Sequence, residues 1–204
     1  MLALAIYLTS DLHADHKNIC KYTQRHLFTS QEDHAEWIAD IWNSTVKPGD
    51  TVYSLGDFMF TSKAERIIEY IAGLSGVKRF ITGNHCNSKA WAHIRKTRCD
   101  DPRLGSVALV DKLHRCHFEV EGTKQMFVMC HFPLAVWENQ HRGAIMLHGH
   151  SHGTYQGSGL CLDVGLDMAY KLYGEHRFFS LEDVIEFMRT REVVSNDYHG
   201  EEDR

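Results

Sequence analysis

The sequence lacks the features that mark several specialised classes of protein. Its six cysteines form no C-x-x-C pair, and no apolar stretch approaches the roughly 20 residues of a membrane span. It also has no internal repeat, no low-complexity tract and no linker rich in Pro, Gly or Ser. These absences exclude a helical membrane protein and a repeat array, and the scattered cysteines indicate reduced thiols in a cytoplasmic protein.

An excess of positive charge is absent too. The 204 residues carry a formal net charge of -5, so a long nucleic acid held in a basic groove is not favoured. A small phosphorylated substrate, such as a nucleotide, remains open, because bound divalent ions would add positive charge. With 43% hydrophobic residues, the composition predicts a single domain over residues 1–195 and a polar tail over residues 196–204. The oligomeric state stays open.

Short apolar runs predict strands. The first, Leu4–Leu8, leads straight into Asp11 and has no basic start or cleavage signal before it, which favours a buried strand over a signal peptide. Arg115–Val120 and Gln125–Cys130 indicate a hairpin that turns at Gly122. The other candidates are Thr51–Leu55, Arg79–Thr82, Phe127–Cys130, Ala144–Leu147 and Leu160–Val164.

Helices are predicted where a capping residue precedes apolar residues at helical spacing. Ser30 precedes a stripe of Trp and Ile residues between positions 37 and 42. Ser62 opens a capping box before an Ile-rich segment that ends near Gly73, and Ser180 opens the last helix. Strands that alternate with helices predict an α/β domain, and the hairpin predicts that its sheet is mixed.

Five polar clusters each follow one of the apolar runs. Loops at the carboxyl ends of strands are the usual place for sites in α/β proteins, so we expect these clusters to converge. Their O and N donors suit Mn, Fe, Zn or Ni, and they are too many for a single tetrahedral ion. The clusters are Asp11-Leu12-His13, Gly56-Asp57, Gly83-Asn84-His85, His131 and Gly149-His150-Ser151-His152.

The spacing within the clusters suits two ions. Asp11 and His13 are two residues apart, so on an extended strand exit both point to the same side and can bind one ion. A carboxylate such as Asp57 has two oxygens and can serve both ions at once. Two ions beside a free histidine are a device for hydrolysing phosphate esters.

The order D-x-H, G-D, G-N-H, H, G-H-x-H resembles the calcineurin-like metallophosphoesterase superfamily, with small bacterial and phage members the most similar. The resemblance implies a four-layer α/β/β/α sandwich of two mixed sheets. It also implies two divalent ions, with Mn expected to support activity in vitro. Carried over by position, one ion would be held by Asp11, His13, Asp57 and His152, and the other by Asp57, Asn84, His131 and His150.

The resemblance further implies a mechanism. A water that bridges the two ions would be deprotonated and would attack the phosphate ester in line. His85 would be the catalytic residue, as a general acid for the leaving alcohol or as a phosphate contact. The sequence has no C-x5-R signature that would offer a nucleophilic cysteine, and its G-x-S-x-G stretch, Gly149–Gly153, coincides with the G-H-x-H cluster.

One position departs from the family pattern. The family usually has Asp or Glu after G-N-H, and this chain has Cys86, which predicts a weaker hold on His85. Asp15, Asp163 and Asp167 are candidates to replace that carboxylate. Two rival readings stay open: a Mn-dependent nuclease of the same superfamily, and a non-catalytic metal-binding scaffold.

Three further residues are candidate substrate contacts. His16 and Asn18 sit beside the first ligands, and Arg142 could clamp a phosphate. The identity of the substrate and of the native metal stays open, because specificity resides in loops with no readable code.

Overall fold

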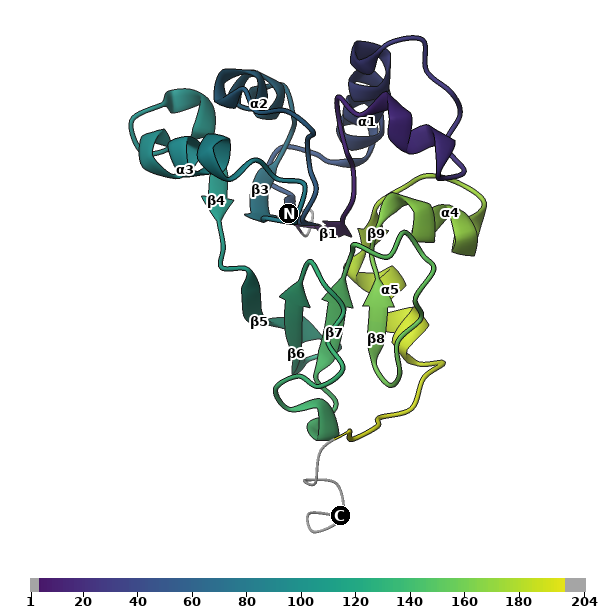
Figure 1. Cartoon of the computed structure of the whole chain (residues 1–204). Coiled ribbons are helices and arrows are strands. Elements are labelled where there is room, and N and C mark those ends of the chain that lie inside the picture. Colours follow the sequence, from purple (N-terminus) through teal and green to yellow (C-terminus); the bar gives the residue numbers. More distant parts are fainter. Residues whose placement is uncertain (1–3, 197–204) are drawn as a thin grey trace.

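A computed structural model describes residues 4–196 of the chain. Within this range the strands form two sheets, which lie one above the other in Figure 1. In spatial order, the upper sheet contains β4 (Val107–Leu109), β3 (Val77–Ile81), β2 (Thr51–Leu55), β1 (Ile6–Thr9) and β9 (Phe179–Ser180). The lower sheet contains β5 (Leu113–Val120), β6 (Thr123–Cys130), β7 (Ile145–His148) and β8 (Cys161–Asp163).

Both sheets are mixed. Strands β1 to β4 run parallel, while β9 pairs antiparallel with β1. In the lower sheet, β5 and β6 form the antiparallel hairpin, and β6, β7 and β8 run parallel. The prediction of an α/β fold with two mixed sheets is therefore confirmed. As a result, β1, β2, β3, β6 and β7 deliver their carboxyl ends to one region of the molecule.

Helices cover the outer face of the upper sheet (Figure 1). These are α1 (Gln31–Thr45), α2 (Ala64–Ala72) and α3 (Ser88–Thr97). Their apolar stripes bury Trp42, Ile67 and Trp91 against Phe58 and Phe80 in one cluster. The remaining helices are α4 (Leu166–Tyr173), α5 (Leu181–Met188) and the short 3-10 helices η1 (Lys17–Lys21), η2 (Pro102–Leu104) and η3 (Gln140–Arg142).

A second hydrophobic core lies between the two sheets. Along β6, Phe127 and Met129 belong to this inner core, whereas Val128 packs on the opposite face. Trp137 covers that opposite face and donates its Nε1–H to the carbonyl of Ala144 at 2.8 Å. Alternation along the strand thus gives the lower sheet two buried faces.

Two of the three predicted helix starts and the predicted hairpin turn are confirmed. Ser30 and Ser180 each form a capping box with the aspartate three residues later. The hairpin turns at Glu121 and Gly122, which both have positive φ, as a two-residue turn requires. The capping box predicted at Ser62 is wrong. The helix begins at Ala64, and the hydroxyl of Thr61 accepts the backbone N–H of Lys63 instead.

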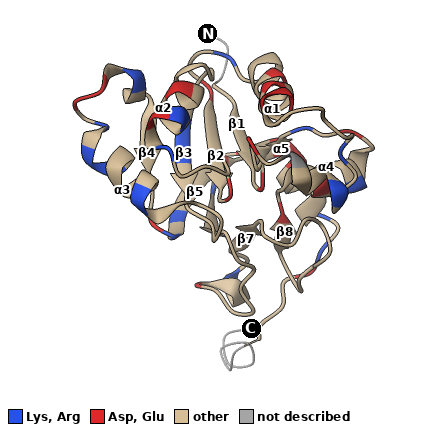
Figure 2. Cartoon of the chain, turned by 45° about the horizontal axis from the view of Figure 1, so that its top comes forward, with Lys and Arg blue, Asp and Glu red and all other residues tan. Residues whose placement is uncertain are grey.

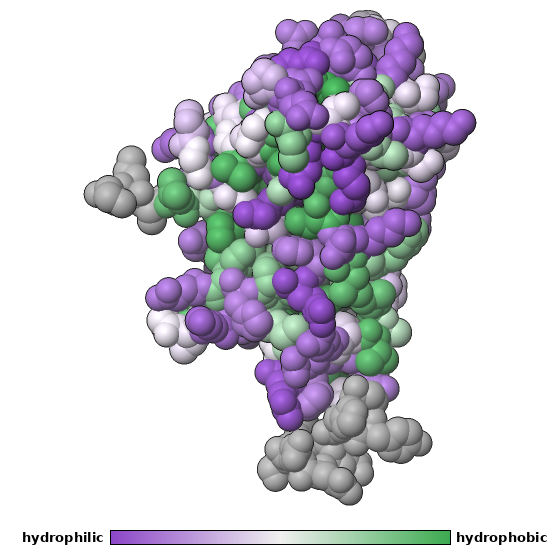
Figure 3. Space-filling model, turned by 90° about the vertical axis from the view of Figure 1, so that its left-hand side faces the viewer, coloured by the Kyte–Doolittle hydropathy of each residue, from purple (hydrophilic) through white to green (hydrophobic). Residues whose placement is uncertain are grey.

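The surface carries charges of both signs. In Figure 2, Lys and Arg are spread over the α3 side and the region of α4, while Asp and Glu lie on α1 and on loops in the middle of the view. Figure 3 looks onto the edge formed by β4 and β5, where hydrophobic residues show between hydrophilic ones. Leu113, on β5, is 44% exposed there.

Three smaller expectations concern the thiols, the polar tail and a membrane span. All six cysteines are free. Of the predicted polar tail, Asn196 is bound to the carbonyl of Ala135, and residues 197–204 lie outside the described residues. Among residues 4–196, no helix has the length and apolar character needed to cross a bilayer.

Buried His34 on α1 predicts acid sensitivity. Neither of its ring nitrogens has a hydrogen-bond partner among the described residues. Burial lowers the pKa of His34 from 6.5 to about 3, and the charge of Arg25 adds to this. Between these pH values the unfolded chain binds a proton that the folded chain excludes, so stability falls as pH falls. Urea denaturation should show a loss of about 2–3 kcal/mol of unfolding free energy between about pH 6.5 and about pH 4.

The variant His34→Phe removes this titrating group and should therefore lose less stability over the same pH range. His93→Phe, on the exposed side of α3, is the matched control and should keep the slope of the wild type. Parallel pH dependence of the wild type and His34→Phe would contradict the assignment.

Candidate metal centre

The loops that leave β1 and β2 stay paired beyond the ends of their strands. The backbone N–H of Asp11 donates to the carbonyl of Gly56 at 3.1 Å, and that of His13 donates to Asp57 at 2.8 Å. An isolated parallel bridge then joins Ala14 to Met59. Two clusters that are 46 positions apart in the sequence are therefore held side by side by the backbone itself.

The backbone is left-handed at five of the seven proposed ligand positions, which corrects the expectation of an extended strand exit. Asp11 and His13 have φ of 55° and 51°, and Asp57 has 48°. His150 and His152 have 67° and 47°. Such conformations are uncommon outside glycine and cluster at functional sites, where surrounding structure holds them. In the loops after β1 and β7, the left-handed residues thus alternate along the chain, at positions 11 and 13 and at positions 150 and 152.

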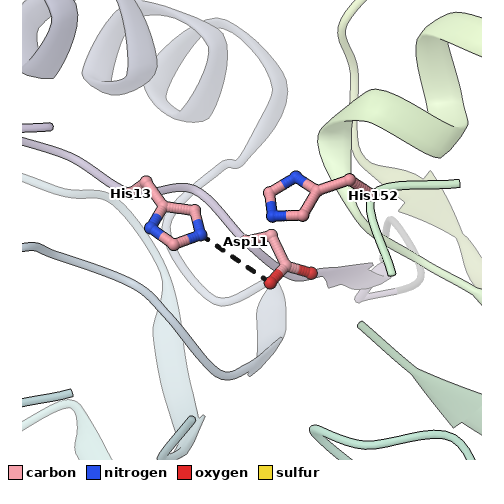
Figure 4. Close-up of side chains that lie close together, drawn as sticks. All are labelled: Asp11, His13 and His152. Atoms are coloured by element: carbon pink, nitrogen blue, oxygen red, sulfur yellow. Dashed lines mark ion pairs between the residues drawn. The ribbon is translucent and has the colours of Figure 1, made fainter. Parts of the chain in front are cut away.

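Asp11, His13 and His152 form the first group of donors (Figure 4). Their ligand atoms all lie within 4.8 Å of one another. Oδ1 of Asp11 and Nε2 of His13 are 3.9 Å apart, both atoms are buried, and neither has a hydrogen-bond partner among the described residues. A buried carboxylate oxygen and an imidazole nitrogen left facing each other fit a cation between them.

Asp57 lies between that group and a second one. Its Oδ2 is 3.8 Å from Nε2 of His13 and 3.3 Å from Nε2 of His131. The same His131 nitrogen is 2.8 Å from Oδ1 of Asn84. Asp57, His131 and Asp11 form a second group within 4.8 Å. The geometry thus places Asp57 where a shared ligand would stand.

His150 completes the second group at its exposed side. Its ring centroid is 5.2 Å from that of His131 and 4.6 Å from that of Phe132. Its backbone N–H donates to Oδ2 of Asp11 at 2.8 Å, which links the loop after β7 to the loop after β1. All seven predicted metal ligands therefore lie around one centre, with donors from both sheets.

The protonation of these groups follows from burial. Burial lowers the pKa of His13 to about 2, so its ring is neutral and a nitrogen lone pair is available for a cation. Burial also raises the pKa of Asp11 to about 6, with the charge of Asp163 adding to the effect. For His131, burial lowers the pKa, but the hydrogen bond and charge of Asp57 outweigh it and the net shift is upward.

Two histidines are oriented by partners at their other ring nitrogen. Nδ1 of His131 lies 2.9 Å from the carbonyl of Leu55, an acceptor, so it carries the proton and Nε2 faces the centre. Nδ1 of His152 lies 2.6 Å from Oδ2 of Asp167 in the same way. Such partners fix the tautomer and direction of a metal-binding imidazole.

A buried arginine, which sequence reasoning missed, stands behind the first group. Arg25 is 3% exposed, and its guanidinium donates to both carboxylate oxygens of Asp167 at 3.0 and 2.9 Å. It also donates to the backbone carbonyls of Leu12 and Asp11 at 2.8 and 2.6 Å. Burial would raise the pKa of Asp167, but His152 and Arg25 lower it well below its ordinary value. Arg25 therefore ties the β1 loop to the carboxylate that orients His152.

His85 stands at the exposed rim of the centre. Its backbone N–H donates to Oδ1 of Asp57 at 2.9 Å, and its ring centroid is 5.5 Å from that of His13. The sulfur of Cys86 accepts the backbone N–H of Gly83 at 3.3 Å and packs against the helix-side core. Burial raises the pKa of this thiol, which keeps it protonated.

The three carboxylates considered as replacement partners for His85 are engaged elsewhere. Asp15 binds Arg66, and Asp167 binds Arg25 and His152. Asp163 accepts from the hydroxyl of Ser151 and from the backbone N–H groups of Gly153 and Gly165. The contacts found for these three candidates are thus with partners other than His85.

The three predicted substrate contacts differ in where they lie relative to the centre. The ring of His16 stacks on Phe60 with centroids 4.2 Å apart and lies 5.7 Å from the ring of His13. Asn18 is exposed on η1. Arg142 ends η3, just before the amino end of β7, whereas His150 follows the carboxyl end of that strand. Arg142 and His150 therefore lie at opposite ends of β7, which does not favour Arg142 as a substrate contact.

A groove opens beside His85. It has a volume of about 710 Å³ and is lined by Gln31, residues 60–62 and residues 84–88. It therefore shares Asn84 and His85 with the centre and includes the exposed ring of Phe60.

Gly149 sits where a side chain cannot fit. A Cβ at this position would overlap the hydroxyl of Ser10 and Oδ2 of Asp11. We expect Gly149→Ala to lower the free energy of unfolding by about 1–3 kcal/mol, because the core must shift to make room. Gly73→Ala, on a helix end with ordinary φ and more space, should cost less than about 1 kcal/mol. Urea denaturation compares the two, and equal losses would contradict the overlap.

Comparison with known proteins finds relatives without a stated activity. No family model matches the chain. The uncharacterized protein MJ1445 of Methanocaldococcus jannaschii is 30% identical over 151 residues, which cover 74% of this chain and 70% of that protein. The Gene 66 proteins of Mycobacterium phages L5 and D29 are 27% and 25% identical, over 72% and 82% of this chain and 76% and 90% of their own lengths.

One solved structure shares the fold. The crystal structure of the protein of unknown function AQ665 from Aquifex aeolicus aligns with a TM-score of 0.63. The match covers 91% of this chain and 100% of that chain at 18% identity. At this identity the likeness concerns the fold alone.

Proposed function

The chain belongs to the same family as the uncharacterized protein MJ1445, and since that name states no activity, we propose from the geometry of the centre that the protein hydrolyses phosphate esters with two divalent ions. The observation that carries the proposal is the pair of buried atoms, Oδ1 of Asp11 and Nε2 of His13, that face each other without a hydrogen-bond partner among the described residues. Leaving such atoms unpaired is costly, and a cation removes the cost.

The donor set fits two hard-to-borderline divalent ions. Asp11, His13, Asp57 and His152 would hold one ion. Asp57, Asn84, His131 and His150 would hold the other. When bound, such ions lower the pKa of water and offset the charge of the phosphate oxygens. Mn, Fe, Zn and Ni all accept this mixture of carboxylate, amide and imidazole donors.

The chain's own residues supply orientation and proton transfer. Arg25 and Asp167 hold His152, and the carbonyl of Leu55 holds His131, so the donor atoms stand ready before substrate arrives. His85 projects from the exposed rim, where its ring could give a proton to the leaving alcohol. Its backbone N–H is anchored on Asp57, so the proton donor and the shared carboxylate move together.

Membership of the calcineurin-like metallophosphoesterase superfamily is part of the proposal. The ordered motifs from Asp11 to His152 support it, and an α/β arrangement of two mixed sheets is compatible with it. The helices over the upper sheet are compatible with one outer layer of the four-layer sandwich expected of that superfamily. Here the outer face of the lower sheet is packed by Trp137 and its neighbours.

Metal binding and ester hydrolysis test the proposal together. Purified protein dialysed against Mn²⁺ should hold two ions per chain and hydrolyse chromogenic phosphate monoesters or diesters, and chelation should abolish the activity. His131→Ala should lose an ion and the activity while remaining folded. Two bound ions with no hydrolysis of any ester would favour a metal-binding scaffold, and absence of bound metal would refute the proposal.

A further inference from the structure

We propose that the groove beside the centre binds the alcohol half of the ester and selects an uncharged alcohol with a flat apolar face. This inference rests on the proposed function and names the substrate class of the same site. The groove is the hollow lined by Gln31, residues 60–62 and residues 84–88.

The position of the groove assigns it to the leaving group. Asn84 and His85 belong both to the groove and to the candidate centre. The ring of His85 lies between the two, 5.5 Å from the ring of His13 and 5.9 Å from that of Phe60. An alcohol that takes its proton from His85 therefore departs into this groove.

The size of the groove limits the alcohol to a small molecule. Its volume of about 710 Å³ falls inside the range of roughly 300–1,000 Å³ that is usual for small-molecule sites. A second hollow, of about 310 Å³, lies between the β5–β6 hairpin and α5 and shares no lining residue with the groove.

Apart from His85, the lining of the groove is polar and carries no formal charge. Its side chains offer hydroxyls and amides, from Ser62, Thr61, Gln31 and Asn87 among others, and none is Asp, Glu, Lys or Arg. The hollow at α5, in contrast, is lined by four glutamates and an arginine. Away from His85, a charged group on the alcohol would find no ionic partner among these side chains, whereas a neutral group could form hydrogen bonds.

Phe60 gives the groove a flat apolar wall. The ring is 43% exposed, although large hydrophobic side chains are usually buried. Stacking on His16, with ring planes 18° apart, supports the ring from behind. A ring held in this way loses little conformational freedom when a flat ligand packs on it.

Matched substrates and ligands test the assignment. In the Mn²⁺-loaded protein, kcat/KM for para-nitrophenyl methyl phosphate should exceed that for its ring-carboxylated analogue by about tenfold. Calorimetry should show the same preference for phenylphosphonate over carboxyphenylphosphonate. The binding experiment does not require turnover.

Variants of the groove sharpen the test. Phe60→Ala should raise KM for the uncharged ester by about three- to tenfold with little change in kcat, and Phe60→Tyr should restore KM. Ser62→Lys should raise kcat/KM for the carboxylated ester by about fivefold. Tyr22→Ala removes an aromatic ring that is 81% exposed outside the groove and should match the wild type.

The outcomes separate this inference from the proposed function. Equal handling of charged and uncharged probes, or a Phe60→Ala variant that behaves as Tyr22→Ala does, overturns the groove assignment while leaving phosphoesterase activity intact. Selective, Phe60-dependent phosphonate binding without hydrolysis supports the groove and overturns the proposed function.

Discussion

Replacing Asp57 with Asn is expected to lower phosphoesterase turnover by about a thousandfold and to remove at least one of the two ions. Asp57 is 2% exposed and its Oδ2 lies between the nitrogens of His13 and His131. Asn keeps the shape but loses the charge, and its amide places a donor or a weaker acceptor where the carboxylate stood. Loss of a shared ligand removes several kcal/mol of charge stabilisation, which corresponds to this change in rate.

Two measurements check this expectation: metal content after dialysis and hydrolysis of a chromogenic diester. Asp50→Asn is the matched control, since Asp50 is a buried carboxylate at the opposite end of β2 that accepts the backbone N–H groups of Ala5 and Lys47. It should cost stability and leave both ions in place. An Asp57→Asn protein with two ions and near-normal turnover would remove Asp57 from the centre.

Replacing Arg25 with Met should lower the free energy of unfolding by about 3–5 kcal/mol, because it leaves the buried carboxylate of Asp167 without its ionic partner. The same change removes the hydrogen bonds that Arg25 donates to the backbone carbonyls of Asp11 and Leu12. Since Asp167 also orients His152, the affinity for metal should fall by about 10–100-fold in the protein that remains folded. Urea denaturation and a metal titration measure the two effects.

Arg66→Met provides the comparison for Arg25. Arg66 also makes a two-pronged contact with an aspartate, Asp15, but its side chain is 36% exposed. Breaking an ion pair at that level of exposure should cost less than about 1 kcal/mol and leave metal affinity unchanged. If the two arginine variants lost equal stability, burial of the Arg25–Asp167 pair would not explain the expected loss.

The residues proposed as ligands could be recognised from sequence because each follows an apolar run by a few residues. A strand end and the donor after it are local features, so Asp57 and His131 were visible as members of one site. Arg25 was not, because its partner Asp167 lies 142 positions away and neither residue belongs to a motif. The conformation of Asp11 and His13 was also missed, since left-handed backbone at a non-glycine residue depends on tertiary support.

The secondary structure likewise separates into elements with local sequence signals and elements without them. Ser30 and Ser180 signal their helices through local hydrogen bonds, and both starts were found. Helix α4 begins after Gly165 with no side-chain cap, and β9 has two residues, too few to show any periodicity. Helix α3 could have been found, because Asn87 caps it by accepting the backbone N–H of Ala90.

The left-handed backbone at His13, His150 and His152 also bears on how this chain evolves. A β-carbon in that conformation costs about 1–2 kcal/mol relative to ordinary helical backbone, a cost that glycine avoids. Each substitution of one of these histidines by glycine would therefore relax the backbone locally while removing a proposed metal ligand. Selection for folding alone would favour glycine at these positions. A lineage that keeps histidine there does so against its own conformational preference, which makes these three positions sensitive reporters of whether a descendant still uses the centre.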